Sequence, residues 1–398
     1  MAGPMRVRRV LNIQQKLLYL AQALAVYRFS KGMVGIFIPF VILQGGGTLL
    51  MVAGYYLIRT AGKLLLNFEA MRLIRRYGAH VGLALGFTFE VLQLAGIFGF
   101  VSTQELAFVL FGGAAAALAD AFSDNARHLF IPRIMQDRAK SSSLATLEIM
   151  GQVADFLGPL VGAMIGIFLG ADWLLAIALV VLTVTYFPLR AMGRIAAFDG
   201  TTLRFTFRGA PPRDLIANFC QCADESIGLM LWPIYLAIFL GTFETIGAVA
   251  GLTALVTMIV VWVAGRRGDR GRLEPVLRQG TYALSAMNLL RTLAVTPGSI
   301  ALVGSGYMAS REYLLNAWNA TFYTHAKRKG LEYVYAMETA SGLAYTFIWS
   351  LLFVLVLVLD DVRTIFVAVF VLAAALIWGT FLFTRIERRR YAGPFRIR

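Results

Sequence analysis

Long apolar stretches alternate with short polar connections along this chain, and most of its positive charges fall in every second connection. Twelve such stretches can be delimited. Of the 37 Lys and Arg residues, 30 lie in seven terminal or connecting segments: 6–16, 72–76, 127–140, 190–213, 266–278, 327–329 and 385–398. The six intervening connections contain only Arg363. Short basic loops stay in the cytoplasm and short uncharged loops cross, so the pattern predicts twelve membrane crossings with both termini in the cytoplasm.

The spanning elements are expected to be helices. Hydrophobic residues form 59% of the chain and charged residues 15%, whereas soluble domains have about 45–50% and about 25%. Residues 365–383 contain no ionisable side chain, and this length is close to the ~20 residues that a bilayer-crossing helix needs. A membrane barrel would instead show alternating segments of about ten residues. The expected spans are 17–42, 48–67, 80–98, 105–126, 143–168, 173–189, 214–240, 246–265, 277–296, 299–322, 332–358 and 363–384.

Composition and motifs also argue against several classes of protein. The net charge of +15 is explained by the loop bias, so we expect the basic face to lie against anionic lipid and expect no nucleic-acid partner. A cleaved signal peptide is disfavoured, because its removal would place the N-terminus on the wrong side of the charge pattern. Two Cys and three His offer too few ligands for a metal site. Without a GxSxG, Walker or HExxH motif, we expect neither an enzyme nor a cofactor.

The longest internal connection, 190–213, divides the twelve stretches into six and six. The expected domains are residues 1–189, the cytoplasmic loop 190–213, and residues 214–398 with a basic tail. Short motifs recur in the same order in both halves: Gly35-Ile-Phe-Ile-Pro39 and Gly228-Leu-Met-Leu-Trp-Pro233, Arg75-Arg76-Tyr-Gly78 and Asp269-Arg270-Gly271-Arg272, Leu147-Glu148 and Met337-Glu338. Many secondary transporters are built from internal repeats, with the binding site where the repeats meet.

This layout resembles the major facilitator superfamily, whose turn motif after helices two and eight is Gly, three residues, Asp-Arg, then Gly and basic residues. Residues 265–272 match that motif one residue short, and residues 75–78 keep its basic residues and Gly without the Asp. Residues 154–163 are similar to the exporter motif of the fifth helix, G-x-x-x-G-P-x-x-G-G, with Ala at both ends. The resemblance implies an all-α membrane fold of two pseudo-symmetric six-helix bundles. We expect a monomer in the inner membrane of a prokaryote.

Ionisable residues inside the apolar stretches are the candidate functional residues. A charge near mid-bilayer costs at least ~2.5–3.5 kcal/mol, so it usually faces a partner or a wet cavity. These residues concentrate on stretches one, four, seven and ten, which line the central cavity in the resembled fold. The expected substrate and ion pathway consists of Arg28, Lys31, Asp120, Asp124, Asp155, Asp224, Glu225, Arg311 and Glu312.

Structural pairing is an alternative role for the charges of the first half. Arg28 and Lys31 share one helix face. Pairing with carboxylates of the same half (Asp120, Asp124 or Glu90) explains them as well as attraction of an anionic solute does. Both explanations therefore stay open at this point.

The remaining carboxylates have the same two interpretations. Asp155 is more simply explained by a salt bridge to a nearby cation than by proton transfer. Asp224 and Glu225 are adjacent and point about 100° apart, so they cannot both face the cavity centre. One of them is a candidate proton carrier, because desolvation and a neighbouring carboxylate raise a carboxyl pKa, although structural pairing is favoured. Glu90 and Arg291 have no assigned role.

Acidic residues also occupy matching places near the cytoplasmic ends of stretches five and eleven. The resemblance implies that these two, Glu148 and Glu338, join the basic turn motifs in a charge network that gates the cytoplasmic side. The expected gating and motif residues are Arg75, Arg76, Gly78, Glu148, Gly158, Pro159, Asp269, Arg270, Arg272 and Glu338.

The sequence thus predicts a secondary active transporter that moves a small organic solute by alternating access. Proton-coupled export is favoured: the direction depends on the fifth-stretch motif, and the coupling on Asp155, Asp224 and Glu225. Two alternatives remain. One is an importer of the same fold. The other is a non-transporting membrane scaffold or lipid-handling protein, whose buried charges would all be paired with no open cavity.

Overall fold

The computed structural model describes residues 4–134, 141–193, 207–268 and 273–384, and the regular structure in these residues is entirely helical. The all-α prediction is therefore confirmed. The helices are α1 Pro4–Gly35, α2 Ile38–Gln44, α3 Leu49–Tyr77, α4 Ala79–Thr103, α5 Leu106–Ile134, α6 Ser141–Leu169, α7 Ala171–Val184, α8 Tyr186–Met192, η2 Phe207–Gly209, α9 Pro212–Glu225, η3 Ser226–Leu231, α10 Trp232–Leu240, α11 Phe243–Gly268, α12 Leu273–Arg291, α13 Pro297–Lys329, α14 Leu331–Val358, α15 Val362–Leu376, η4 Ile377–Thr380 and α16 Phe381–Thr384.

Each expected span overlaps one helix or a run of consecutive helices. Within the described residues, eight helices are long and apolar enough to cross a membrane. Two more, α6 and α11, contain shorter apolar stretches, Val153–Leu169 and Phe243–Ile259. Polar and charged residues such as Asn288, Arg291 and Glu312 lie within α12 and α13, which explains why these helices fall below that standard. The chain is thus a multi-pass membrane protein. Fewer of its described helices meet the length and hydropathy standard than the twelve crossings that the loop charges predict.

The repeated Gly…Pro motif interrupts regular α-helix in each half, but in two different ways. In the first copy, α1 ends at Gly35 and α2 begins at Ile38, with Pro39 in its first turn. In the second copy the helix is continuous: α9 passes into the π-helix η3, and α10 follows directly with Pro233 in its first turn. Proline lacks a backbone N–H and therefore removes one helical hydrogen bond. The motif thus produces a turn in the first half and a π-helical segment in the second.

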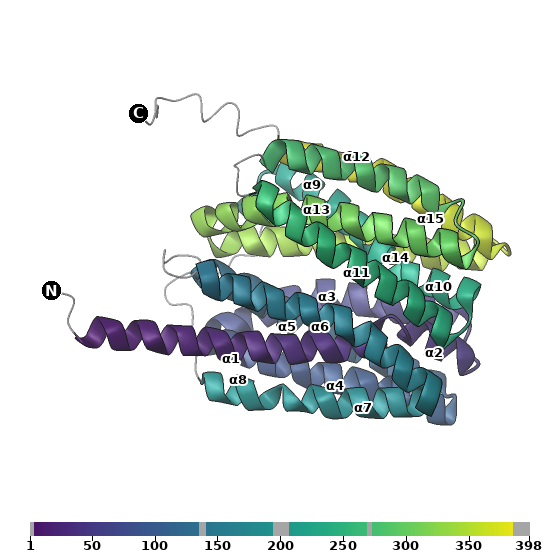
Figure 1. The fold of residues 1–398 in the computed structure, drawn as a ribbon, viewed down its shortest axis with the longest axis horizontal. Helices are drawn as coiled ribbons and strands as arrows, with labels where there is room; N and C mark the ends of the chain where they lie inside the picture. Colours follow the sequence, from purple (N-terminus) through teal and green to yellow (C-terminus); the bar gives the residue numbers. More distant parts are fainter. Residues whose placement is uncertain (1–3, 135–140, 194–206, 269–272, 385–398) are drawn as a thin grey trace.

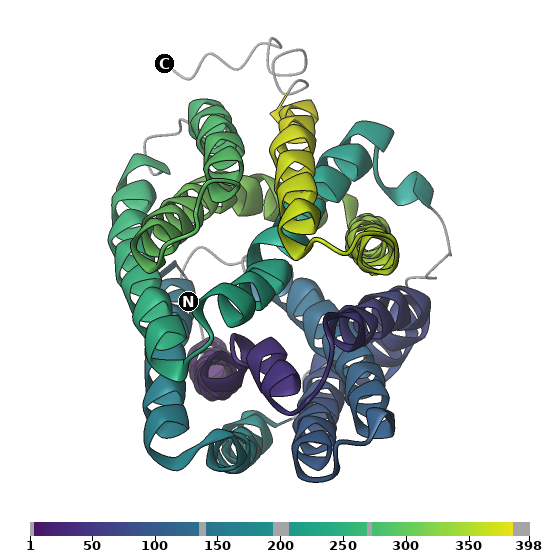
Figure 2. The ribbon, with the colours of Figure 1, turned by 90° about the vertical axis from the view of Figure 1, so that its right-hand side faces the viewer.

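The first half of the chain, α1 to α8, and the second half, α9 to α16, lie side by side (Figures 1 and 2). The described chain begins and ends at one end of the bundle, at the left of Figure 1, and we call this end the terminal side. The main contacts between the halves are those of α3 with α14 and of α6 with α11. The short helices α2 and α10 also meet, as do α5 and α13.

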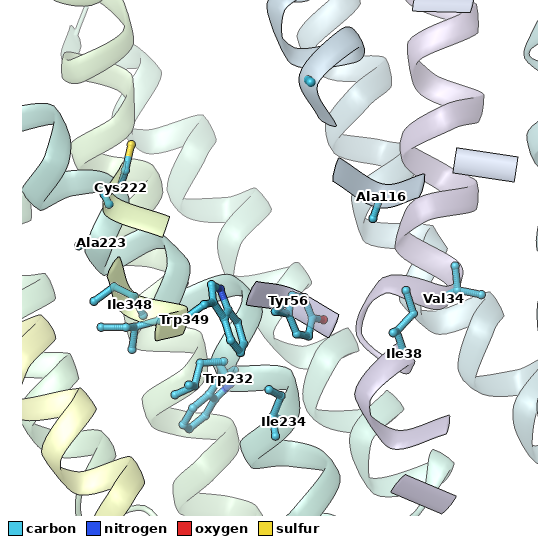
Figure 3. Packing of buried hydrophobic residues seen from close by; sticks show 14 of the residues in the cluster. Val34, Ile38, Tyr56, Ala116, Cys222, Ala223, Trp232, Ile234, Ile348 and Trp349 are labelled. Atoms are coloured by element: carbon cyan, nitrogen blue, oxygen red, sulfur yellow. The ribbon is translucent and has the colours of Figure 1, made fainter. Parts of the chain in front are cut away.

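The two main seams between the halves differ in chemistry. Where α3 meets α14, the ring of Tyr56 stacks on that of Trp349, with centroids 4.4 Å apart (Figure 3). Where α6 meets α11, a Cβ at Gly247 would overlap the Cβ of Ala163. Small residues allow close helix approach in membranes. One seam is therefore filled by aromatic rings, and the other brings two backbones together.

Glycine turns connect helices at the terminal side, and capping side chains begin helices at the opposite side. Gly78 has φ 95° and alone connects α3 to α4, and Gly330, with φ 78°, connects α13 to α14. Both values lie in a region that side chains with a Cβ rarely adopt. At the other side, Thr48 and Thr296 accept hydrogen bonds at the N-termini of α3 and α13, as Asp361 does for α15. Large apolar side chains are exposed on the outside, as lipid contact requires, for example Phe168, Phe187, Leu302 and Val358.

Candidate functional site

Two ion pairs, Arg59–Asp120 and Lys63–Asp124, connect α3 to α5. Arg59 and Lys63 lie four residues apart on α3, and Asp120 and Asp124 lie four apart on α5, so each pair shares a helix face. Arg59 donates to both oxygens of Asp120, from Nε at 2.6 Å and from Nη2 at 3.1 Å. Lys63 donates to one oxygen of Asp124 at 2.7 Å, and Arg127 donates to the other at 2.7 Å. Sequence reasoning did not pair these helices, although the matched spacing was a usable signal.

Lys31 connects the Arg59–Asp120 ion pair to two further helices: α1, on which Lys31 lies, and α4, which carries Glu90. Its Nζ lies 3.2 Å from Asp120 Oδ1 and 3.6 Å from Glu90 Oε2. The hydroxyl of Tyr27 accepts from Lys31 and donates to Glu90, each at 3.1 Å. We call Lys31, Arg59, Glu90 and Asp120 the first-half network. It contains two cations and two carboxylates, so it is neutral, and it gives Glu90 the role that the sequence left open.

A second group, which we call the central cluster, consists of Arg28, Asp155, Glu225, Arg311 and Glu312. Arg28 binds Asp155 with two N–H groups, Nε donating at 3.0 Å, so the favoured salt bridge of Asp155 is present. Arg311 lies between two carboxylates, 2.5 Å from Glu225 Oε1 and 2.6 Å from Glu312 Oε1. Glu312 also interacts electrostatically with Arg28 and Asp155. Electrostatic interaction therefore relates the Arg28–Asp155 pair of α1 and α6 to the Glu225–Arg311–Glu312 group of α9 and α13.

The central cluster differs from the first-half network in charge. It holds three carboxylates and two guanidinium groups, so one negative charge is in surplus when all are ionised. The exposed fractions of the side chains are 27% for Arg28, 50% for Asp155, 23% for Glu225, 10% for Arg311 and 24% for Glu312. In the first-half network Lys31 is 32% exposed, whereas Arg59, Glu90 and Asp120 are nearly buried. A surplus carboxylate with a partly exposed side chain is a candidate for proton uptake.

Asp224 and Glu225 point to different partners, as their angular separation predicts. Glu225 belongs to the central cluster, whereas Asp224 is 2% exposed. Asp224 accepts a hydrogen bond from Asn288 Nδ2 at 2.5 Å and another from the Tyr307 hydroxyl at 2.9 Å. Structural pairing is therefore the role that the geometry assigns to Asp224.

Arg291 lies fully buried beside Asp224. Its guanidinium carbon is 3.6 Å from the centroid of the Tyr307 ring and 4.3 Å from that of Trp232, within the range of cation–π attraction. It donates to Asn288 Oδ1 at 3.4 Å, so the Asn288 amide connects the carboxylate of Asp224 to the guanidinium. Sequence reasoning assigned Arg291 no role. Asn288 lies three residues away on the same helix, α12, but the aromatic rings lie on α10 and α13, and no local pattern marks them.

On the terminal side, a third group of charges crosses from one half to the other. Glu338 of α14 is hydrogen-bonded through Oε1 to His128 Nδ1, and its Oε2 lies 3.8 Å from Lys63 Nζ. Beside it, Asn67 Nδ2 donates to Thr339 Oγ1 at 3.1 Å. Glu338 does join a charge network between the halves. Its partners are on α3 and α5, however, and the basic turn motif supplies neither of these two contacts.

The structure describes only some of the other predicted gating residues. Arg75 and Arg76 lie in the last turn of α3, and Gly78 is the glycine of the turn that follows. Gly158 packs closely on α1, since a Cβ there would lie 2.9 Å from the carbonyl oxygen of Phe29, and Pro159 follows it inside α6. The structure does not describe the side chain of Glu148 or the residues Asp269, Arg270 and Arg272.

Metal ligands are not gathered at any of these places. Among the described residues, no group of three or more His, Cys, Asp or Glu is positioned to hold a metal ion. In the central cluster, the guanidinium of Arg311 lies between Glu225 and Glu312, where it would repel a metal cation. Cys220 and Cys222 are buried free thiols.

Three solved structures have the fold of this chain. A bacterial homologue of the iron transporter ferroportin in an outward-facing state matches with a TM-score of 0.67 and 17% identity, over 94% of this chain and 100% of that one. The inward-facing state matches with a TM-score of 0.66 and 16% identity, over 93% and 98%. An outward-facing state with soaked iron matches with 0.64 and 17%, over 95% and 99%. No family model and no curated protein matches the sequence. The chain thus shares its fold with these bacterial ferroportin homologues over nearly its whole length.

Proposed function

We propose that this protein is a secondary transporter that crosses the membrane twelve times and works by alternating access between its two six-helix halves. Three features support this. The fold is that of a transporter known in outward-facing and inward-facing states. The Gly…Pro motif interrupts regular α-helix at corresponding places, by a turn in the first half and by a π-helix in the second. Exchanging the halves converts the α3–α14 contact into the α6–α11 contact, as a pseudo-twofold axis between repeats requires.

The central cluster is the single observation that carries the transport proposal. A scaffold needs its buried charges paired, as they are in the neutral first-half network. The central cluster includes residues of both halves, keeps part of every side chain accessible and holds one carboxylate more than its cations neutralise. We place the solute and ion pathway here, with the termini in the cytoplasm of a prokaryotic cell as the basic loops predict.

Proton coupling in this scheme depends on Glu225 and Glu312. Both carboxylates pair with the guanidinium of Arg311. Protonating either one removes the surplus negative charge and leaves Arg311 paired with the other carboxylate, which is still ionised. Asp224, the other candidate from the sequence, is closed in by Asn288 and Tyr307 and is not assigned this role. Export of a small organic solute remains the favoured direction, on the fifth-helix motif alone.

Iron is the substrate named for the matching bacterial homologues, and we do not propose it for this chain. The described residues contain no three-ligand group. The two guanidinium groups of the central cluster, Arg28 and Arg311, are cations in the proposed pathway. A divalent metal ion would meet repulsion there without ligands to offset its dehydration.

Two-sided solvent access tests the transport proposal. Single cysteines introduced along α1 and α9, in a background with Cys220 and Cys222 replaced by serine, would be labelled with a membrane-impermeant maleimide from each side of proteoliposomes. Alternating access predicts positions that react from both sides. Positions that react from one side only, all along both helices, would support the scaffold or lipid-handling alternative.

A carboxylate-to-amide series tests the coupling. A thermal-shift screen of small organic solutes at acidic and neutral pH identifies a substrate, whose flux is then measured with and without an imposed pH gradient. Glu225→Gln and Glu312→Gln should each remove the dependence of flux on the gradient. Glu69→Gln is the matched control, because Glu69 is an exposed residue of α3 whose partner is Arg72. Gradient-dependent flux that persists in both central variants would retire the assignment, and gradient-driven uptake would favour an importer.

A further inference from the structure

At the side opposite the termini, one aromatic ring of the second half lies among residues of the first half. Phe243 begins α11, and its ring centroid is 5.3 Å from that of Phe37 and 4.8 Å from that of Phe40. The planes of Phe243 and Phe40 meet at 80°, an edge-to-face arrangement that aromatic pairs favour. This end of the bundle is at the right of Figure 1, where α2 and α10 lie. The ring therefore connects the two halves by apolar contact.

The first half has a place shaped for this ring. Phe37 lies in the turn between α1 and α2 and Phe40 in the first turn of α2, and both are buried. Beside them is Gly166 of α6, where a Cβ would overlap three atoms of the Phe243 ring. We call Phe37, Phe40 and Gly166 the first-half socket. The first Gly…Pro motif thus has an effect beyond its turn, because the turn holds both phenylalanines beside α11.

We propose that Phe243, seated in the first-half socket, is an apolar gate that closes the side opposite the termini. The inference rests on the proposed alternating access, because a gate requires that the halves separate at this side. Phe243 belongs to the second half and all three socket residues to the first, so separation withdraws the ring from the socket. Water that enters the opened side then hydrates three aromatic rings, which favours return to the closed state.

The contacts that continue from the gate toward the middle of the bundle are also apolar. Gly247 and Gly251 follow Phe243 at one-turn spacing, so the three share a face of α11. A Cβ at Gly247 would overlap the Cβ of Ala163, and one at Gly251 would overlap a methyl group of Leu160. Separating these residues loses dispersion contacts and breaks no ion pair among them. The gate is therefore the end of a continuous apolar seam between α6 and α11.

The test measures the distance between the halves at this side. Spin labels on Ser102→Cys near the end of α4 and Val295→Cys before α13, both exposed, would be placed in the background that lacks Cys220 and Cys222. Pulsed electron–electron double resonance in proteoliposomes would report the ratio of close to distant populations. Phe243→Ala removes two aromatic contacts, so this ratio should fall at least roughly fivefold.

A second variant and a control separate gating from general loss of packing. Gly166→Ala keeps the ring of Phe243 but fills its place with a Cβ, and alanine suits a helix better than glycine does, so the ratio should fall in a folded protein. Phe239→Ala is the matched control. Phe239 of α10 packs on Tyr235 and Phe366 of its own half, so its loss should leave the ratio unchanged. Thermal unfolding of each variant checks that it is folded.

The gate is overturned if folded Phe243→Ala and Gly166→Ala both keep the wild-type ratio, or if Phe239→Ala lowers the ratio as much as Phe243→Ala does. Two-sided labelling of α1 and α9, together with distances that Phe243→Ala leaves unchanged, would retire the gate and keep the transport proposal. Opening of this side in Phe243→Ala, with one-sided labelling all along both helices, would retire the transport proposal and keep Phe243 as the residue that closes this side.

Discussion

Removing one partner of the ion pair between α3 and α5 should destabilise the protein strongly. Arg59 is 7% exposed and Asp120 6%, and two hydrogen bonds of 2.6 and 3.1 Å join them. Asp120→Leu leaves the guanidinium charged, buried and without a carboxylate on α5. Breaking a buried pair in this way costs about 3–5 kcal/mol, and an unpaired arginine at the bilayer centre costs at least ~2.5–3.5 kcal/mol. We therefore expect the free energy of unfolding to fall by about 3–5 kcal/mol.

A second substitution should recover most of that loss. Replacing a buried ion pair by apolar residues of similar volume is often neutral or stabilising. The double variant Arg59→Met, Asp120→Leu should accordingly unfold within about 1.5 kcal/mol of the wild type. Lys31 loses one partner but keeps Glu90 at 3.6 Å. The coupling energy between the two sites should then be at least ~2 kcal/mol, as for other groups in direct contact.

The assay is equilibrium unfolding of purified protein in detergent, followed by circular dichroism, for the wild type, both single variants and the double variant. The exposed pair Glu69 and Arg72, with 57% and 63% of their side chains accessible, is the matched control, and Glu69→Leu should cost less than ~1 kcal/mol. The reasoning fails if Asp120→Leu costs no more than that control, or if the two single losses simply add in the double variant.

Three smaller predictions concern helix packing and helix ends. Gly162→Ala should lower the free energy of unfolding by about 1–3 kcal/mol, because the new Cβ would lie 2.1 Å from the carbonyl oxygen of Met33. Gly35→Ala is the control: a Cβ at Gly35 meets open space, so the melting temperature should stay unchanged or rise. Equal effects of the two substitutions would refute the packing model. Gly78→Ala should cost about 1 kcal/mol or more, since the turn needs φ 95°, and no loss would show that the turn tolerates a Cβ. Hydrogen bonds from Thr364 and from backbone N–H groups lower the pKa of Asp361, so its stabilising effect should be complete above the ordinary aspartate pKa of about 3.9 and lost as the pH falls below it. Asp361→Ala should lower the melting temperature at neutral pH. In acid the difference in melting temperature between the variant and the wild type should become smaller, and a difference that stays the same at every pH would contradict this.

Features that depend on one segment at a time could be predicted from the sequence. The apolar stretches became helices, and the Gly…Pro motif coincides with a turn in the first half and a π-helix in the second. The adjacent carboxylates Asp224 and Glu225 point to different partners, because 100° per residue is a property of any helix. These predictions needed no knowledge of which helices meet.

Features that depend on pairs of distant helices could not be predicted in the same way. Two partners of Glu338, His128 and Lys63, are 210 and 275 positions away, on α5 and α3, and the resemblance had pointed only to the basic turn motifs. Arg291 needs Trp232 of α10 and Tyr307 of α13 before its burial makes sense. A buried charge in a membrane chain signals that a partner exists, but its sequence position does not say which helix supplies the partner.

The two seams between the halves show how far internal repeats constrain function. Exchanging the halves interchanges the α3–α14 and α6–α11 contacts, so backbone symmetry relates them. Yet the α3–α14 seam brings Lys63 Nζ to 3.8 Å from Glu338 Oε2, whereas α6–α11 has small residues at contacts such as Gly247 with Ala163. Breaking the first contact separates a buried ion pair, whereas separating Gly247 from Ala163 loses dispersion contacts between small residues. The repeat thus defines where the halves touch, and unlike side chains on equivalent helices give the two seams different electrostatics.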